Sequence, residues 1–150
     1  PRHVRVGHLP RFQGRVLVVE DNALNQRVAA RLLERLGLHV DVADDGVLAL
    51  EACARERYDL VFMDCHMPQM DGFEATQHLR ERDEPGVRLP IVALSATTVS
   101  EERQRCLDSG MDGFLSKPFL LPELIVVLER HLRPANEAPD TPANVPAEST

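Results

Sequence analysis

The sequence contains no tryptophan, one tyrosine and only three cysteines among its 150 residues. The cysteines, Cys53, Cys65 and Cys106, are odd in number, lie far apart along the chain and form no CxxC pair. A disulfide framework or a zinc site is therefore not expected, and the thiols are predicted to be reduced, as in a cytosolic protein. No apolar stretch approaches the length of a membrane span, and no secretory leader opens the chain.

The sequence also lacks an excess of basic residues: the formal net charge is −7, and no basic stripe runs along any predicted element. That balance disfavours nucleic acid and anionic membrane as direct partners. Lys117 is the only lysine, and every other basic residue except histidine is an arginine. The hydrophobic fraction of 43% is typical of a globular chain, and the length leaves room for one domain with a substantial core.

Both ends of the chain are expected to lie outside the folded unit. Residues 1–14 show no clear hydrophobic period and are predicted to be an N-terminal linker. Residues 134–150 contain four prolines and no basic residue, and are predicted to be a disordered Pro/Ala-rich tail. The predicted domain therefore spans residues 15–133, and it contains no internal repeat.

Within this span, strand and helix patterns alternate. Short apolar runs, typical of strands buried on both faces of a parallel sheet, and one alternating segment predict five strands. Between them, apolar residues at helical spacing predict five helices, with Gly37 and Gly110 as stop signals and a capping box at Thr98 and Glu101. The strands are expected at 16–19, 39–43, 60–63, 91–94 and 113–116, and the helices at 24–36, 47–54, 73–79, 98–110 and 121–132. This alternation predicts an α/β fold with helices on both faces of the sheet.

Polar side chains follow four of these strands. Glu20 and Asp21 follow the first strand, Asp64 the third, Ser95 the fourth and Lys117 the fifth. Ligands of open parallel sheets bind outside the carboxyl ends of the strands, so these groups are expected to meet at one edge. Each has a simpler interpretation: the acids favour helix N-termini, the serine suits a turn and the lysine suits solvent. Asp44 and Asp45, after the second strand, are predicted to start a helix instead.

Three carboxylates that meet at one edge repel each other, by ~4 kcal/mol per pair at ~4 Å and an effective dielectric constant of ~20. A hard cation that prefers oxygen, Mg²⁺ above all, relieves this repulsion and also coordinates a phosphoryl oxygen. Together with an ammonium group and a hydroxyl, such a site suits phosphoryl transfer. One carboxylate then remains as the nucleophile, and Asp64, which ends a central strand, is the best placed to form an acyl phosphate.

Four segments of the sequence carry a family resemblance. VLVVEDN (16–22), DLVFMDCHMPQMDG (59–72), PIVALSA (90–96) and FLSKPF (114–119) resemble the motifs of the receiver domain of bacterial two-component signalling. The resemblance covers roughly residues 15–133. It implies a flavodoxin-like (βα)5 fold, a doubly wound five-stranded parallel sheet with strand order 2-1-3-4-5.

The same resemblance implies roles for individual residues. Asp64 would accept a phosphoryl group from a phosphohistidine, and the domain would catalyse its own phosphorylation and dephosphorylation. Mg²⁺ would bind to Asp21 and Asp64 directly, to Glu20 mainly through water and to the backbone carbonyl of His66. An imidazole ligand is the alternative for His66, but hard Mg²⁺ prefers oxygen.

Further implied roles concern the switch. Lys117 would pair with the phosphoryl group, and its bond to Pro118 would be cis. Ser95 would hydrogen-bond the phosphoryl group while Phe114, the aromatic switch residue, turns inward. Departures from the common pattern are Glu20 in place of Asp, Ser95 in place of Thr and Phe114 in place of Tyr. These changes leave the turnover rate and the strength of the switch open.

The amino-acid sequences of the motifs most resemble those in receivers of hybrid sensor histidine kinases, so the parent chain is expected to be such a kinase. The domain itself is expected in the cytoplasm, without direct membrane contact, even where the parent is membrane-bound. The expected partner is a histidine kinase's dimerisation and phosphotransfer helices, or a histidine phosphotransfer protein. The partner is predicted to contact Leu24, Phe119 and Leu120, for which burial in the core is the alternative.

The 95–117 surface is expected to switch on phosphorylation, because its helix has only Val99, Cys106 and Leu107 as apolar anchors. The main rival is an interaction module that binds partners without phosphoryl chemistry. Other enzymes are disfavoured by missing motifs: a haloacid-dehalogenase-type phosphatase needs DxD, a P-loop hydrolase GxxxxGK[ST] and a dinucleotide binder GxGxxG.

Overall fold

Five strands and five helices alternate along residues 9–96 and 100–132, which are the residues that the computed structural model describes. They are β1 (Arg15–Val19), α1 (Ala23–Arg35), β2 (His39–Ala43), α2 (Gly46–Arg55), β3 (Leu60–Asp64), α3 (Gly72–Glu81), β4 (Ile91–Ser95), α4 (Ser100–Ser109), β5 (Gly113–Ser116) and α5 (Leu121–His131). The five predicted βα units are confirmed. The majority of the helix and strand ends differ from the predicted ends by one or two residues.

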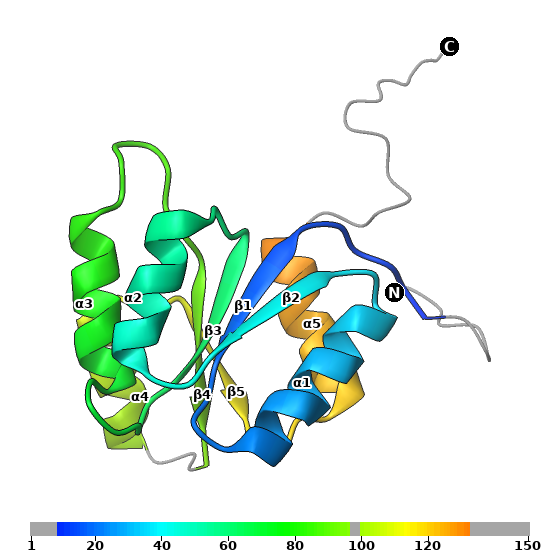
Figure 1. Cartoon of the computed structure of the whole chain (residues 1–150). Coiled ribbons are helices and arrows are strands. Elements are labelled where there is room, and N and C mark those ends of the chain that lie inside the picture. The colour runs from blue at the N-terminus through cyan, green and yellow to red at the C-terminus, as the bar shows by residue number, and fades with distance from the viewer. Residues whose placement is uncertain (1–8, 97–99, 133–150) are drawn as a thin grey trace.

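The strands form one parallel sheet in the order β2-β1-β3-β4-β5, as expected (Figure 1). β1, β3 and β4 occupy the interior of the sheet, and their residues are almost all buried, which explains their uninterrupted apolar sequences. The alternating strand β2 lies at an edge. Because all strands run the same way, their carboxyl ends share one edge of the sheet.

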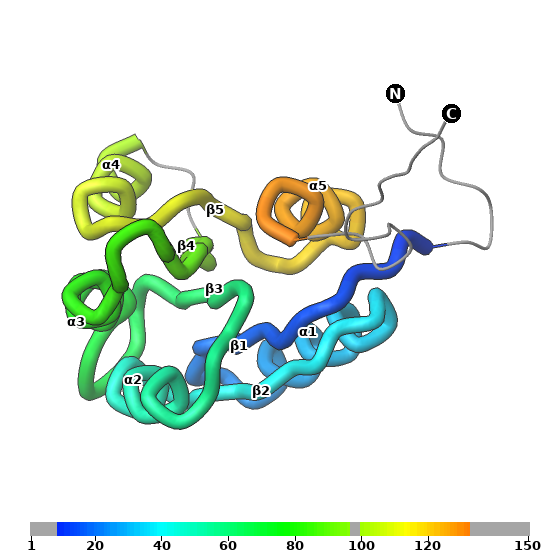
Figure 2. Tube along the Cα trace, turned by 90° about the horizontal axis from the view of Figure 1, so that it is seen from above, coloured from blue at the N-terminus to red at the C-terminus, as the bar shows by residue number. Residues whose placement is uncertain are grey.

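Helices cover both faces of the sheet (Figure 2). Successive residues of a strand point to opposite faces, and the interior strands divide their side chains between two cores accordingly. Leu17, Val61 and Ile91 pack with residues of α2, α3 and α4. On the other face, Val18 and Phe62 pack with residues of α1 and α5. Helices therefore cover both faces of the sheet, and the edge formed by the carboxyl ends of the strands remains available for a functional site.

Short polar side chains begin three of the helices. Asn22, Asp45 and Asp71 cap α1, α2 and α3, and each accepts a hydrogen bond at 2.9 Å from a backbone N–H three residues on. Asp45 therefore starts a helix as predicted, while Asp44 accepts a hydrogen bond from the side chain of Gln26. Of the capping box predicted for α4, Thr98 lies outside the described residues.

The predicted anchors of α4 are correct only in part. Cys106 is fully buried, but Leu107 is 49% exposed, and the prediction that it anchors the helix is wrong. Val99 lies outside the described residues. The buried residues that α4 contributes to the fold are Cys106 and Ser109, so the helix is held to the sheet by few apolar contacts.

The cysteines are free thiols, as predicted, but two of them meet in space. The sulfur atoms of Cys65, directly after β3, and Cys106, on α4, lie 3.6 Å apart in the core. Burial raises the pKa of both thiols, so both are held in the neutral form. This contact packs α4 against the segment that follows Asp64.

Phe12 is buried in the core on the α1 and α5 side, and its backbone N–H donates to the carbonyl of Leu36 at 2.8 Å. A side chain inside the segment expected to be a linker therefore takes part in packing. Among the described residues, none of the helices combines the length and the apolar character that crossing a bilayer requires.

Candidate functional site

An acidic site lies at the carboxyl ends of the strands. The ammonium group of Lys117, which follows β5, lies 2.8 Å from Oε1 of Glu20 and 2.9 Å from Oδ2 of Asp64. Carboxylate oxygens of Glu20, Asp21 and Asp64 lie within 4.8 Å of one another. Four side chains from three strand ends, separated by up to 97 positions in the sequence, thus meet at one point.

Local backbone contacts fix the two buried carboxylates. Oε2 of Glu20 accepts a hydrogen bond from the backbone N–H of Asn22 at 3.0 Å. Asp64 is the last residue of β3, and the first residue of α3, Gly72, packs on its backbone carbonyl. A Cβ atom at Gly72 would lie 2.2 Å from that carbonyl oxygen, so only glycine allows this approach. The glycine of the MPQMDG segment therefore helps to hold Asp64 in place.

Burial and pairing act against each other in this site. Burial raises the pKa of Asp64, and the hydrogen bond from Lys117 offsets this only in part. Burial would also raise the pKa of Glu20, but its pairing with Lys117 and the hydrogen bond from the backbone N–H of Asn22 outweigh this effect and lower the pKa. The pKa of Lys117 is raised, because its two carboxylate partners outweigh the effect of burial. The lysine is therefore charged and neutralises part of the acidic charge.

The donor set suits a hard divalent cation. It consists of carboxylate oxygens only, two of them on buried residues and one on the exposed Asp21. Oε1 of Glu20 is buried and, among the described residues, accepts no hydrogen bond of good geometry, although Lys117 lies close by. One ammonium group cannot neutralise three carboxylates, so the site keeps an excess of negative charge that a cation such as Mg²⁺ fits.

Ser95 and His66 of the predicted site both contact Glu102, a residue that the sequence analysis did not identify. Oγ of Ser95 donates a hydrogen bond to Oε2 of Glu102 on α4 at 2.5 Å. Oε1 of the same carboxylate lies 2.9 Å from Nε2 of His66. Burial would raise the pKa of Glu102, but the hydrogen bonds from Ser95 and His66 outweigh it and lower the pKa. Glu102 is therefore a charged acceptor that joins α4 to two segments of the site.

The imidazole of His66 is 65% exposed and engaged with Glu102, which leaves the backbone carbonyl as the expected ligand atom of this residue. Phe114, the expected aromatic switch residue, is half-buried on β5. The guanidinium of Arg103 on α4 lies 5.0 Å from the centre of its ring. The bond between Lys117 and Pro118 is cis, as predicted.

The amino-acid sequence of this chain also matches a known protein family. Residues 16–129 match the family described as the response regulator receiver domain. The chain belongs to this family. The resemblance proposed from the four sequence motifs is thereby confirmed, as is the flavodoxin-like fold with strand order 2-1-3-4-5.

Similar receivers occur in much larger proteins. The chain is 45% identical over 118 residues to hybrid signal transduction histidine kinase A of Dictyostelium discoideum; the match covers 77% of this chain but 6% of that kinase. A solved receiver domain of the sensor histidine kinase PA1611 from Pseudomonas aeruginosa, with a magnesium ion coordinated in its active site cleft, is 41% identical with a TM-score of 0.72. This match covers 79% of the chain and 97% of that structure.

A third similar structure is a receiver in a complex. It is the receiver domain of the Saccharomyces cerevisiae response regulator Ssk1, crystallised with the histidine phosphotransfer protein Ypd1. The identity is 27% and the TM-score 0.73, over 81% of this chain and 89% of the other. The chain is therefore similar to receiver domains from a bacterium and from a yeast.

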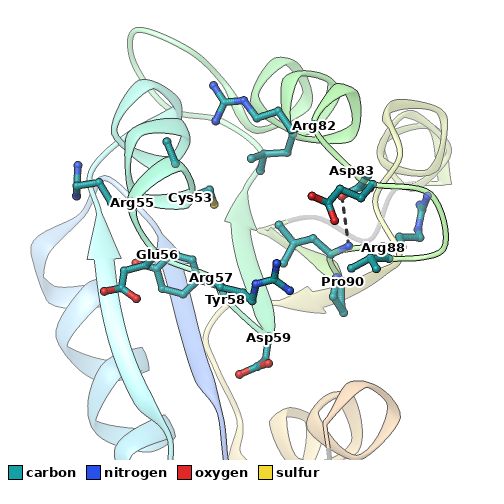
Figure 3. A pocket seen from close by; sticks show the side chains of 15 residues that line it. Cys53, Arg55, Glu56, Arg57, Tyr58, Asp59, Arg82, Asp83, Arg88 and Pro90 are labelled. Carbon is teal, nitrogen blue, oxygen red and sulfur yellow. Dashed lines mark hydrogen bonds between the residues drawn. The ribbon is translucent and has the colours of Figure 1, made fainter.

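A pocket of this receiver, whose lining is drawn in Figure 3, lies at the ends of the strands opposite to the acidic site. It has a volume of about 520 Å³ and is lined by residues that precede β3 and β4, such as Tyr58 and Pro90. Four arginines and four acids line it, so their charges cancel: Arg55, Arg57, Arg82, Arg88, Glu56, Asp59, Asp83 and Glu84. The formal charges of the lining residues therefore sum to zero.

Proposed function

We propose that Asp64 of this receiver accepts a phosphoryl group from a phosphohistidine in a two-component phosphorelay. One observation carries the proposal. The Asp64 carboxylate ends a buried central strand, lies 2.9 Å from the only lysine of the chain and shares its site with two more carboxylates. No structural need for burying such a group at a strand end is apparent from its contacts, whereas a phosphoacceptor needs this arrangement.

Glu20, Asp21, Asp64 and the backbone carbonyl of His66 would hold Mg²⁺. When bound, this cation supplies charge neutralisation for the oxygens of the transferring phosphoryl group. The exposed Asp21 would hold the cation from the solvent side, and the buried Glu20 would hold it from the inner side. The magnesium-bound receiver of PA1611 supports this assignment.

Phosphoryl transfer requires one bond to form as another breaks. A carboxylate oxygen of Asp64 attacks the phosphorus atom, the P–N bond to the donor imidazole breaks, and the nitrogen keeps the electron pair. Lys117 stays charged and stabilises the negative oxygens during the transfer. Ser95 then donates its hydroxyl hydrogen to a phosphoryl oxygen, and Phe114 turns inward, which changes the 95–117 surface. Attack of water on phosphorus later breaks the bond between phosphorus and the Asp64 oxygen, releases inorganic phosphate and restores the carboxylate.

The parent protein is proposed to be a hybrid histidine kinase, in which residues 15–133 form the receiver and residues 1–14 and 134–150 connect or follow it. The small share of the Dictyostelium kinase that the chain covers supports a larger parent. The domain is proposed to work in the cytoplasm. Its donor would be a kinase's phosphotransfer helices or a histidine phosphotransfer protein, as in the yeast complex.

Acetyl phosphate tests the proposal without the native donor. The wild-type domain with acetyl phosphate and Mg²⁺ is expected to gain one phosphoryl group in the intact mass, and peptide mapping after borohydride reduction should place it on Asp64. With EDTA in place of Mg²⁺ the adduct should fall at least about tenfold. Absence of any adduct under both conditions would support the rival function, an interaction module without phosphoryl chemistry.

Docking of the donor is expected beside α1 and the loop before α5. Leu24 is 61% exposed and Leu120 is 52% exposed, which favours a contact role over a core role, while Phe119 is half-buried against the core. Leu24 and Leu120 follow strand ends on the edge of the sheet that carries Asp64, and exposed leucines there are typical of a surface that a partner covers. These two leucines are therefore proposed as apolar contacts for the donor helix.

Leu24→Asp is expected to slow transfer from a phosphorylated histidine phosphotransfer protein at least about tenfold, because an apolar contact is lost and a charge is buried. Its reaction with acetyl phosphate should stay within about twofold of the wild type. Leu48→Asp on α2 provides the matched control, because Leu48 is also exposed but lies on the opposite face. Equal slowing with both phosphoryl donors would rule out a docking role for Leu24.

A further inference from the structure

The hydroxyl of Ser95 is already engaged on α4. It donates to Glu102 at 2.5 Å, and this carboxylate also bonds to the ring of His66. A hydroxyl carries a single hydrogen, so it cannot donate to Glu102 and to a phosphoryl oxygen on Asp64 at the same time. The two acceptors therefore compete for one hydrogen atom.

We propose that Glu102 is a positioning residue that holds the Ser95 hydroxyl on α4 in the unphosphorylated domain, so that phosphorylation has to displace the Ser95–Glu102 hydrogen bond. The inference rests on the proposed function, because the competing acceptor is the phosphoryl group on Asp64. It adds a residue of α4 to the switch and gives that helix a defined contact that is lost when the domain is activated.

The position of Glu102 explains how this contact acts on the whole helix. Its carboxylate spans from β4 to the segment after Asp64, while the next residue, Arg103, covers the ring of Phe114. Two successive residues of α4 thus contact the two predicted switch residues. Because α4 has few buried apolar side chains, these polar contacts add to a small number of interactions that keep the helix in place.

Removal of the competitor should favour the activated state. Glu102→Ala is expected to bind beryllofluoride, a phosphoryl mimic, about tenfold more tightly than the wild type in the presence of Mg²⁺, which corresponds to about 1.4 kcal/mol. Glu102→Gln keeps the shape but accepts a weaker hydrogen bond, so its affinity should lie between the two. Calorimetric titration measures both, and the Gln variant serves if the Ala variant folds poorly.

Two further variants separate this role from a general loss of negative charge. Glu101→Ala removes the same charge from an exposed neighbour in the first turn of α4 and should bind the mimic as the wild type does. In a Ser95→Ala background, Glu102→Ala should no longer change the affinity, since it acts through the hydroxyl. A merely structural role of Glu102 would not depend on Ser95 in this way.

Amide spectra provide a second readout. In Glu102→Ala without the mimic, the signals of residues 95 and 100–117 should move part of the way toward their beryllofluoride-bound positions. The inference would be overturned if Glu102→Ala bound beryllofluoride with the wild-type affinity. It would also be overturned if Glu102→Ala raised the affinity equally in the Ser95→Ala background. Either result would leave the proposed function intact. A wild-type domain that bound no mimic would overturn the proposed function and the inference together.

Discussion

Asp64→Asn is expected to form no phosphoryl adduct with acetyl phosphate and Mg²⁺, a loss of at least about a hundredfold in rate relative to the wild type. The amide has nearly the shape of the carboxylate but lacks the anionic oxygen that attacks phosphorus. Glu20 cannot replace it, because its two oxygens face Lys117 and the backbone N–H of Asn22. Intact mass over a time course measures the adduct.

Asp21→Asn is the matched control for this prediction. Asp21 belongs to the same acidic cluster but is exposed and follows β1 by two residues. Asp21 is proposed as a ligand and not as the nucleophile. The Asp21→Asn variant should therefore form less adduct at low Mg²⁺ and recover at least half of the wild-type rate at high Mg²⁺. An adduct on Asp64→Asn at the wild-type rate, with unchanged circular dichroism, would exclude Asp64 as the phosphoacceptor.

The acidic site could be predicted from the sequence because parallel strands place their carboxyl ends together. Uninterrupted apolar runs located β1, β3 and β4, and the polar residue after each run then had to lie on one edge. The contacts of Lys117 with Glu20 and Asp64 agree with the expectation that these groups meet at one edge. The shared direction of the strands was enough to place these residues on one edge, whereas the strand order came from the family resemblance.

Glu102 could not be predicted in the same way. It lies in a helix rich in charged residues, beside Glu101, and nothing in the local sequence distinguishes the two acids. Its role depends on which face of α4 turns toward β4, and the weak apolar pattern of that helix does not define this face. The wrong prediction for Leu107 has the same cause, since a few apolar residues were taken to mark the buried face.

Lys117→Met is expected to lower the free energy of unfolding by about 3 kcal/mol at neutral pH in EDTA. The change removes one partner from a buried ion pair and leaves the buried Glu20 and Asp64 carboxylates to repel each other. The estimate lies at the lower end of the cost for buried pairs, because 19% of the Lys117 side chain is exposed. Urea unfolding measures the loss, and saturating Mg²⁺ should restore part of it by binding the folded state.

The loss should depend on pH in a defined direction. Without Lys117, burial and mutual repulsion raise the pKa of both carboxyls in the folded state, while in the unfolded state they stay near ~4. Between these values the folded state binds more protons, so the stability of the variant falls as pH rises. The deficit relative to the wild type is therefore small near pH ~4 and complete above the raised pKa values.

Arg88→Met is the control for loss of a positive charge elsewhere. Arg88 pairs with Asp112 at 2.8 Å, but its side chain is 57% exposed, and its removal should cost about 0–1 kcal/mol without a comparable dependence on Mg²⁺. If Lys117→Met were as stable as Arg88→Met across this pH range, the two carboxylates would not be coupled through the lysine.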